Sequence, residues 1–92
     1  MTRIDLDWVP RLRRGFRFQW EPAQNCHVLL YPEGMIQLND SAAFILQLVD
    51  GTQTVGEIIG TLQENFPDAP DLIGDIQQFM GVAYDNFWLE SN

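Results

Sequence analysis

Cysteine, histidine and lysine are almost missing from this chain of 92 residues, which has one cysteine, one histidine and no lysine. A single cysteine cannot form an internal disulfide, and with a single histidine it cannot supply the four ligands of a structural zinc site. Cys26 and His27 are adjacent in the sequence. Neighbouring side chains on a strand point to opposite faces, so these two cannot form a catalytic thiolate–imidazole pair with each other.

Motifs of common enzyme classes are also missing. The glycines are dispersed, so they form neither a phosphate-binding loop nor a dinucleotide-binding motif. Asp68, Asp71 and Asp75 do not have the spacing of a calcium-binding EF-hand loop, and carboxylates are favourable near a helix N-terminus in any case. We therefore expect a protein that is not an enzyme, with no catalytic residue, no metal site and no cofactor.

Long apolar segments are absent as well. The longest uncharged, mostly apolar run extends from Ser41 to Val49 and is too short to cross a bilayer. The N-terminal residues lack the apolar core of a secretion signal. With 92 residues, of which 46% are hydrophobic, the chain can form one folded domain with a small core. These features predict a soluble, cytoplasmic protein without a membrane partner.

Positive charge is scarce and confined to one end of the chain. The five basic residues are Arg3, Arg11, Arg13, Arg14 and Arg17, whereas residues 18–92 carry eleven acidic side chains and no basic one. Such a body repels phosphate, so we expect no nucleic-acid partner. Residues 1–14 are predicted to form a flexible, arginine-rich arm ahead of a single domain over residues 15–92. This arm is expected to strengthen binding to an acidic partner, with an effect that salt screens.

Three short strands are expected in the first half of the domain. Aromatic and polar residues alternate over residues 16–20, which is typical of a half-buried strand. Residues 26–31 form the second predicted strand and residues 35–38 the third. Between them, Tyr31-Pro32-Glu33-Gly34 has proline second and glycine fourth, as type I turns prefer.

The hairpin register can be predicted from this turn. A three-residue loop closed by Gly34 places Met35 opposite Tyr31. The buried face of the hairpin then carries Cys26, Val28, Leu30, Ile36 and Leu38. In this register the N–H groups of Ile36 and Leu38 point to the open edge of the sheet. The strand 35–38 contains no charge and no proline, so its edge is free to pair with another strand.

Three helices are expected in the second half. The first covers about residues 40–49, the second opens with a capping box of Thr54 and Glu57, and the third begins near Asp71. The third helix has a predicted buried stripe of Leu72, Ile76, Phe79, Met80, Ala83 and Phe87. The predicted fold is therefore α+β and winged-helix-like, with a three-stranded antiparallel sheet followed by three helices. A DNA-binding role is disfavoured because the third helix has no arginine or lysine.

Several segments resemble the PqqD family of small proteins of pyrroloquinoline quinone biosynthesis. These segments are PRLRRGF (10–16), VLLYPEG (28–34), Leu38-Asn39, Ser41-Ala42-Ala43, Ile45-Leu46 and Asp50-Gly51, and the resemblance covers about residues 9–89. It implies a peptide chaperone that binds the ribosomal precursor peptide PqqA and presents it to PqqE. That partner is a radical S-adenosylmethionine (SAM) enzyme that joins a glutamate and a tyrosine of the precursor. The same domain also recurs as the leader-recognition element of other peptide-modifying systems.

The resemblance also implies where the peptide binds. In the family the leader adds as a strand beside the third strand and packs against the third helix, which fits an uncharged edge next to an apolar helix. The predicted peptide-binding residues are Met35, Ile36, Gln37, Leu38, Asp75, Ile76, Phe79, Met80 and Ala83. Family members often have glycine in the turn before Trp88, and here we expect Asn86 to take the left-handed conformation.

Two alternatives remain open from the sequence. The same groove could recognise the leader of a different peptide-modifying pathway. Otherwise the open edge could serve self-association, since the short hinge Leu38-Asn39-Asp40 could exchange hairpins between two chains of a homodimer.

Overall fold

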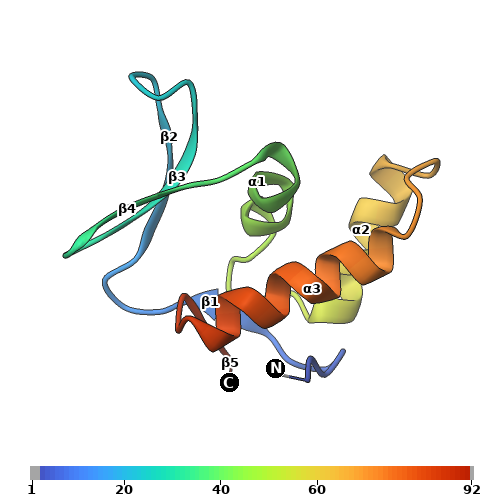
Figure 1. The fold of residues 1–92 in the computed structure, drawn as a ribbon. Helices are drawn as coiled ribbons and strands as arrows, with labels where there is room; N and C mark the ends of the chain where they lie inside the picture. Colours follow the sequence, from blue (N-terminus) through green and yellow to red (C-terminus); the bar gives the residue numbers. More distant parts are fainter. Residues whose placement is uncertain (1–2, 92) are drawn as a thin grey trace.

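A computed structural model describes residues 3–91; Met1 and Thr2 of the predicted arm and Asn92 of the predicted domain lie outside the described residues. The elements in chain order are β1 (Pro10–Leu12), β2 (Arg17–Glu21), β3 (Cys26–Tyr31), β4 (Gly34–Gln37), α1 (Asp40–Gln47), α2 (Val55–Asn65), α3 (Leu72–Asp85) and β5 (Leu89–Ser91). The sheet β2–β3–β4 stands to one side of the three helices (Figure 1). The predicted α+β fold, a three-stranded antiparallel sheet followed by three helices, is confirmed.

The register of the β3–β4 hairpin differs from the prediction by one residue. Tyr31 pairs with Gly34 and Leu29 pairs with Ile36, so the loop contains only Pro32 and Glu33. Gly34 continues the strand and does not have the positive φ expected of a residue that closes a three-residue loop. The predicted pairing of Met35 with Tyr31 is therefore wrong.

This shift changes which residues of β3 share a face with Ile36. Leu29, not Leu30, lies opposite Ile36 and belongs to the main hydrophobic core. Val28 and Leu29 are both fully buried although neighbouring strand residues point to opposite faces. Both sides of β3 are therefore shielded from water at this point. The sequence does not show which of these residues share a face with Ile36, because Val28-Leu29-Leu30 is apolar at every position and does not alternate.

The main core lies between the sheet and the three helices. It consists of Leu29, Leu38, Ala42, Ile45, Leu46, Val55, Ile58, Ile59, Leu62, Ile76, Met80, Ala83 and Leu89. Leu29, Ile58, Ile76, Met80 and Leu89 are its largest fully buried side chains. Burial of a side chain of this size contributes about 1.5–3 kcal/mol each.

The N-terminal segment is part of the folded structure. Pro10–Leu12 pairs antiparallel with Leu89–Ser91, and Pro10 is fully buried. The backbone carbonyls of Leu6 and Trp8 accept hydrogen bonds from Gly56 and Val55 at 3.0 and 2.8 Å. These two N–H groups open α2 and have no partner within that helix. Residues 6–12 therefore belong to the fold, in contrast to the predicted arm over residues 1–14.

The helices α1 and α2 begin with the expected caps. The Asn39 side chain accepts a hydrogen bond from the Ala42 N–H, and Thr54 and Glu57 form both hydrogen bonds of a capping box. A cap of this kind stabilises a helix by about 1 kcal/mol. The cap of α1 also fixes the point where the chain leaves β4, because Asn39 lies directly between the two elements.

The C-terminus of α3 ends in a left-handed residue that was not predicted. Phe87 has φ +60°, whereas Asn86 has φ −92°, so the expectation for Asn86 is wrong. The Trp88 N–H donates to the Ala83 carbonyl at 2.9 Å and the Phe87 N–H donates to the Tyr84 carbonyl at 3.0 Å. This is the Schellman motif, whose left-handed position is usually glycine. A phenylalanine there costs about 1 kcal/mol relative to glycine.

Candidate functional site: an open strand edge beside an apolar groove

The strand β4 is an edge of the three-stranded sheet. The strand order is β2–β3–β4, and within residues 3–91 no strand pairs with the outer side of β4. The Leu38 N–H donates to the His27 carbonyl at 3.0 Å, so this group points toward β3. Backbone groups alternate along a strand, and the pairs Leu29–Ile36 and Tyr31–Gly34 point inward in the same way.

The open backbone groups of β4 are therefore those of Met35 and Gln37. This reverses the sequence-based expectation, in which Ile36 and Leu38 pointed outward. The reversal follows from the one-residue shift in register. Side chains are less affected: Ile36 and Leu38 still face the core side, as predicted, and both pack with the main core.

A groove of about 680 Å³ runs along this edge. It is lined by Ile36, Gln37, Leu38, Asn39, Ser41, Ala42, Phe44, Ile45, Leu62, Phe66, Ala69, Pro70, Leu72, Asp75, Ile76, Gln78, Phe79, Val82 and Trp88. These residues come from β4, from the link between β4 and α1, from all three helices, from the α2–α3 loop and from the turn after α3 (Figure 1). The open strand edge and the groove are thus parts of one surface.

The groove offers an apolar surface with few charges. Its floor includes Ile76, which is fully buried, while Val82 on α3 is 43% exposed. Phe44 and Phe66 come from α1 and the end of α2, and their ring centroids lie 4.9 Å apart. Asp75 is the only charged residue that lines it. An apolar groove with a few polar groups at its rim is typical of a peptide-binding site.

Six of the nine predicted site residues line this groove: Ile36, Gln37, Leu38, Asp75, Ile76 and Phe79. The other three do not line it. Met80 and Ala83 are fully buried in the core, and Met35 is 39% exposed but has its side chain on the opposite face of the sheet.

Three apolar residues that complete the groove are not among the predicted site residues. Phe44, Phe66 and Val82 are exposed apolar residues that line it. On α3 the signal was present, because Asp75, Phe79 and Val82 recur at helical spacing beside the buried stripe. Phe44 and Phe66 lie on other elements, and no local pattern brings them to the groove.

The chemically reactive groups lie apart from the groove. His27 stacks on Phe18 with ring centroids 5.0 Å apart, and Cys26 is a free, partly buried thiol. Burial raises the pKa of Tyr84, and a hydrogen bond with Ser91 partly offsets this effect. Hydrogen bonds from Thr52 lower the pKa of Asp50. Across residues 3–91, the acidic, cysteine and histidine side chains form no group of three suited to a metal ion.

The helices are all shorter or more polar than a membrane span. Within the described part of the chain, no helix has the length and hydropathy needed to cross a bilayer.

Comparison with known proteins gives the same family by three routes. Residues 26–89 match the family model described as coenzyme PQQ synthesis protein D (PqqD). Proteins named "PqqA binding protein" are 61% identical in Stutzerimonas stutzeri A1501 and 59% identical in Pseudomonas aeruginosa UCBPP-PA14, each over 98% of both chains.

A solved structure has the same fold over nearly its whole length. It is the solution NMR structure of the PqqD truncation of Methylobacterium extorquens PqqCD, described as a functional and stand-alone recognition element for ribosomally synthesised and post-translationally modified peptides. Its TM-score is 0.78 at 37% identity, with 97% of this chain and 96% of the other covered.

Proposed function

Since the chain belongs to the PqqD family, we propose that it is a peptide chaperone that binds the precursor peptide PqqA on the open edge of β4. The observation that carries this proposal is that an unpaired, uncharged strand edge and an apolar groove form one surface. A guest strand needs both features, because backbone hydrogen bonds give affinity and side-chain pockets give specificity.

In this proposal the residues of the site have separate roles. The backbone of Met35 and Gln37 pairs with the guest strand, as the alternation of the β3–β4 ladder requires. Every second guest side chain then points into the groove, toward Ile36, Ile76 and Phe79. Apolar guest residues fit these positions, and Phe44 and Phe66 extend the apolar surface beyond the helix α3.

The second part of the proposal is that the bound precursor is presented to the radical SAM enzyme PqqE, as the family resemblance implies. In this role the protein supplies binding and position, and the enzyme supplies the chemistry. We place this step in the cytoplasm, where ribosomal peptides are made and where a single free cysteine is ordinary.

Titration of the 15N-labelled protein with synthetic PqqA, followed residue by residue by NMR, tests the first part. We expect the largest shift changes at residues 35–38 and on the groove side of α3, at Asp75, Phe79 and Val82. As a matched control, a leader peptide from an unrelated peptide-modifying pathway should cause no change at the same concentration. Changes confined to residues outside the groove would show that the peptide binds elsewhere.

The same samples distinguish the alternatives. A response to the unrelated leader, without one to PqqA, would assign the groove to a different pathway. Light scattering over a range of concentrations measures the oligomeric state, and a homodimer that dissociates when PqqA is added would show that self-association uses the same edge.

A further inference from the structure

Arg13 and Arg14 lie in a hydrogen-bonded turn between β1 and β2. The segment Arg13-Arg14-Gly15-Phe16 forms a tight turn, because the Phe16 N–H donates to the Arg13 carbonyl at 3.1 Å and Gly15 has φ +96°. The Arg13 N–H in turn donates to the Trp88 carbonyl at 2.9 Å. The turn is therefore fixed to the end of α3, and the arginine side chains project from an ordered backbone.

Arg13 lies beside the left-handed Phe87. The Arg13 guanidinium lies over the Phe87 ring, 5.6 Å from its centroid, and Phe87 is 65% exposed. Glu90 pairs with two of the arginines: its carboxylate lies 2.9 Å from Arg11 Nε and 3.8 Å from an Arg13 terminal nitrogen. We call the residues Arg11, Arg13, Arg14 and Phe87 the basic surface.

The basic surface differs in charge from the rest of the protein. It combines three cations with the carboxylate of Glu90, which pairs with Arg11 and Arg13, whereas the whole chain has a net charge of −8. Arg14 lies at the exposed position of the turn. Arginine and aromatic side chains are enriched at the centres of protein–protein interfaces. An exposed phenylalanine in a strained conformation is a further sign of a functional surface.

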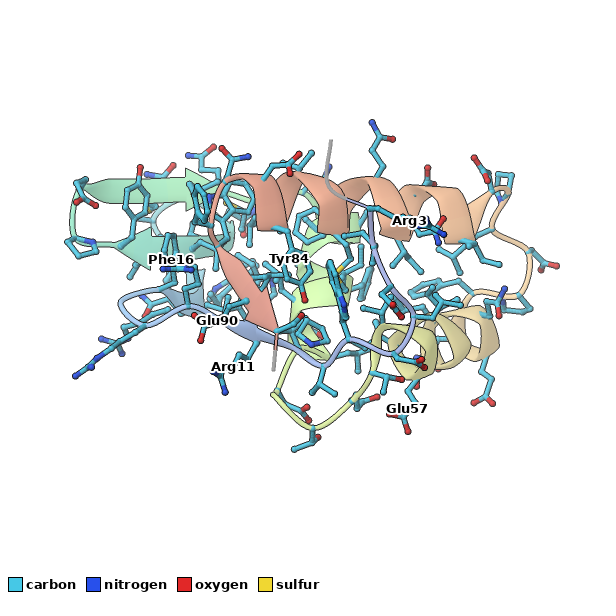
Figure 2. The ribbon with its side chains drawn as sticks, turned by 90° about the horizontal axis from the view of Figure 1, so that it is seen from below. Arg3, Arg11, Phe16, Glu57, Tyr84 and Glu90 are labelled. Carbon is cyan, nitrogen blue, oxygen red and sulfur yellow. The ribbon has the colours of Figure 1, made fainter. Side chains whose placement is uncertain are left out.

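This surface lies at one end of the peptide groove. Trp88 lines the groove, while its carbonyl anchors the arginine turn. On its other side the turn approaches β4: Phe16 stacks on Tyr31 with centroids 5.5 Å apart, and a side chain at Gly15 would meet Pro32. Figure 2 shows Phe16, Glu90 and Arg11 at the same end of the molecule, with Arg3 toward the other end.

The direction of a guest strand connects the two surfaces. Antiparallel pairing is the more common arrangement of neighbouring strands. A guest strand antiparallel to β4 runs toward Gly34, which pairs with Tyr31 at the hairpin turn. In this antiparallel orientation the C-terminal part of the peptide leaves the groove beside Phe16 and the arginine turn.

We propose that the basic surface docks an acidic surface of the protein that acts on the emerging peptide. This inference rests on the proposed function and adds the position and the chemistry of the second interface. A partner bound there receives the C-terminal part of the precursor directly, while the leader part stays in the groove. The partner surface that fits is a cluster of carboxylates around an apolar patch that contacts Phe87.

The test uses the full chain with PqqE as the probe. Arg14→Glu is compared with Arg3→Glu, since both variants make the same charge change on an exposed arginine. Arg3 lies toward the other end of the molecule from Phe16, which belongs to the same turn as Arg14 (Figure 2). At about 50 mM salt we expect Arg14→Glu to weaken PqqE binding about tenfold and Arg3→Glu to weaken it by less than about twofold. At about 500 mM salt the difference should nearly vanish.

A third variant, Phe87→Gly, separates docking from folding. Glycine relieves the left-handed strain but removes the aromatic contact, so thermal stability should rise while PqqE affinity falls about fivefold. All three variants should bind PqqA within about twofold of the unchanged protein, because none of these residues lines the groove.

The outcomes distinguish the two proposals. If the unchanged protein does not bind PqqA, the proposed function fails. If PqqA binds but Arg14→Glu and Arg3→Glu weaken PqqE binding equally, or not at all, the basic surface is not the docking site. If PqqE itself shows no binding, the docking proposal is wrong as well. If Arg14→Glu weakens PqqA binding as strongly as PqqE binding, the surface belongs to the peptide site instead.

Discussion

The two β-sheets of this molecule protect their edges to different degrees. The ribbon of β1 and β5 has three-residue strands, begins with Pro10, and carries Arg11 opposite Glu90. Short strands, proline and charge all discourage pairing with another chain. The outer strand of the second sheet, β4, contains neither proline nor a charged residue, and it borders an apolar groove. One sheet therefore closes the fold, whereas the other leaves an edge available for a guest strand.

The largest expected effect concerns the ribbon. Leu89 lies in β5, is 2% exposed and packs in the main core, so Leu89→Ala should lower the free energy of unfolding by about 3 kcal/mol. Val82→Ala is the control: this residue is 43% exposed, so truncation should cost less than about 0.5 kcal/mol. Urea unfolding measures the free energy of unfolding of both variants. Equal losses would show that Leu89 in the ribbon contributes no more to stability than an exposed residue.

The open edge can be tested with a pair of prolines. Ile36→Pro removes an N–H that points toward β3, so it should destabilise the protein by about 2 kcal/mol or more. Gln37→Pro removes an N–H that points to the open edge, so the fold should persist while PqqA affinity falls at least about tenfold.

The control for this pair is Gln37→Ala, which keeps the backbone N–H but loses the hydrogen bond between the Gln37 and Gln24 side chains. It should bind PqqA within about threefold of the unchanged protein. Thermal melting and isothermal titration calorimetry give the two readouts. Normal PqqA binding by a folded Gln37→Pro variant would exclude strand addition at this edge.

The two sheets also differ in how far the sequence could predict them, because nearby residues form local patterns whereas the β1–β5 ribbon joins distant residues. The caps Thr54 and Glu57 lie three residues apart, so a local pattern was enough to locate α2. The uncharged edge strand over residues 35–38 could also be predicted from the local sequence. The β1–β5 ribbon pairs Arg11 with Glu90 across most of the chain, and its three-residue strands are too short to show a period. Pro10 falls within the predicted flexible arm over residues 1–14, whereas its side chain is fully buried.

For the candidate site, too, the sequence predicted the location but not the details. The uncharged strand 35–38 and the family resemblance pointed to the edge, but the register needed the length of the turn. That length was ambiguous because Gly34 fits either a three-residue loop or a strand. A methionine side chain adapts to binding partners, which favours Met80 as a site residue, yet Met80 belongs to the apolar stripe of the core and is fully buried. Periodicity identifies a helix face but does not divide it between core and groove.

The next largest expected effect is on PqqA affinity, for a charge placed in the wall of the groove. Val82→Asp places a carboxylate on an apolar surface that the guest covers, so PqqA affinity should fall about tenfold. Ile73→Asp is a matched control on the same helix, with 45% exposure against 43% for Val82, and Ile73 does not line the groove. Its affinity should stay within about twofold of the unchanged protein. Similar losses in both variants would mean that acidic charge, not the groove, determines binding.

A smaller effect on stability is expected at the end of α3. Phe87→Gly removes the cost of a side chain at φ +60° and should raise the free energy of unfolding by about 1 kcal/mol. Phe87→Ala is the control, because alanine keeps the Cβ atom that causes the strain and should bring no comparable gain. Chemical denaturation measures both. Equal stabilisation by the two variants would mean that the aromatic ring, not the backbone, carries the cost.

The smallest effect appears only at alkaline pH, in the part of the molecule that holds the ribbon. Tyr84 contacts Trp8 edge to face and is hydrogen bonded to Ser91 in β5. Burial raises its pKa in the folded state above the unfolded value of 10.0. The unfolded chain therefore loses this proton first, so the stability that Tyr84 contributes is complete below pH 10.0 and is lost as pH rises through the folded pKa. Tyr84→Phe cannot ionise, so its stability should depend less on pH above about pH 10. Urea unfolding at a series of alkaline pH values measures the two slopes, and identical slopes would show that Tyr84 ionises equally in both states.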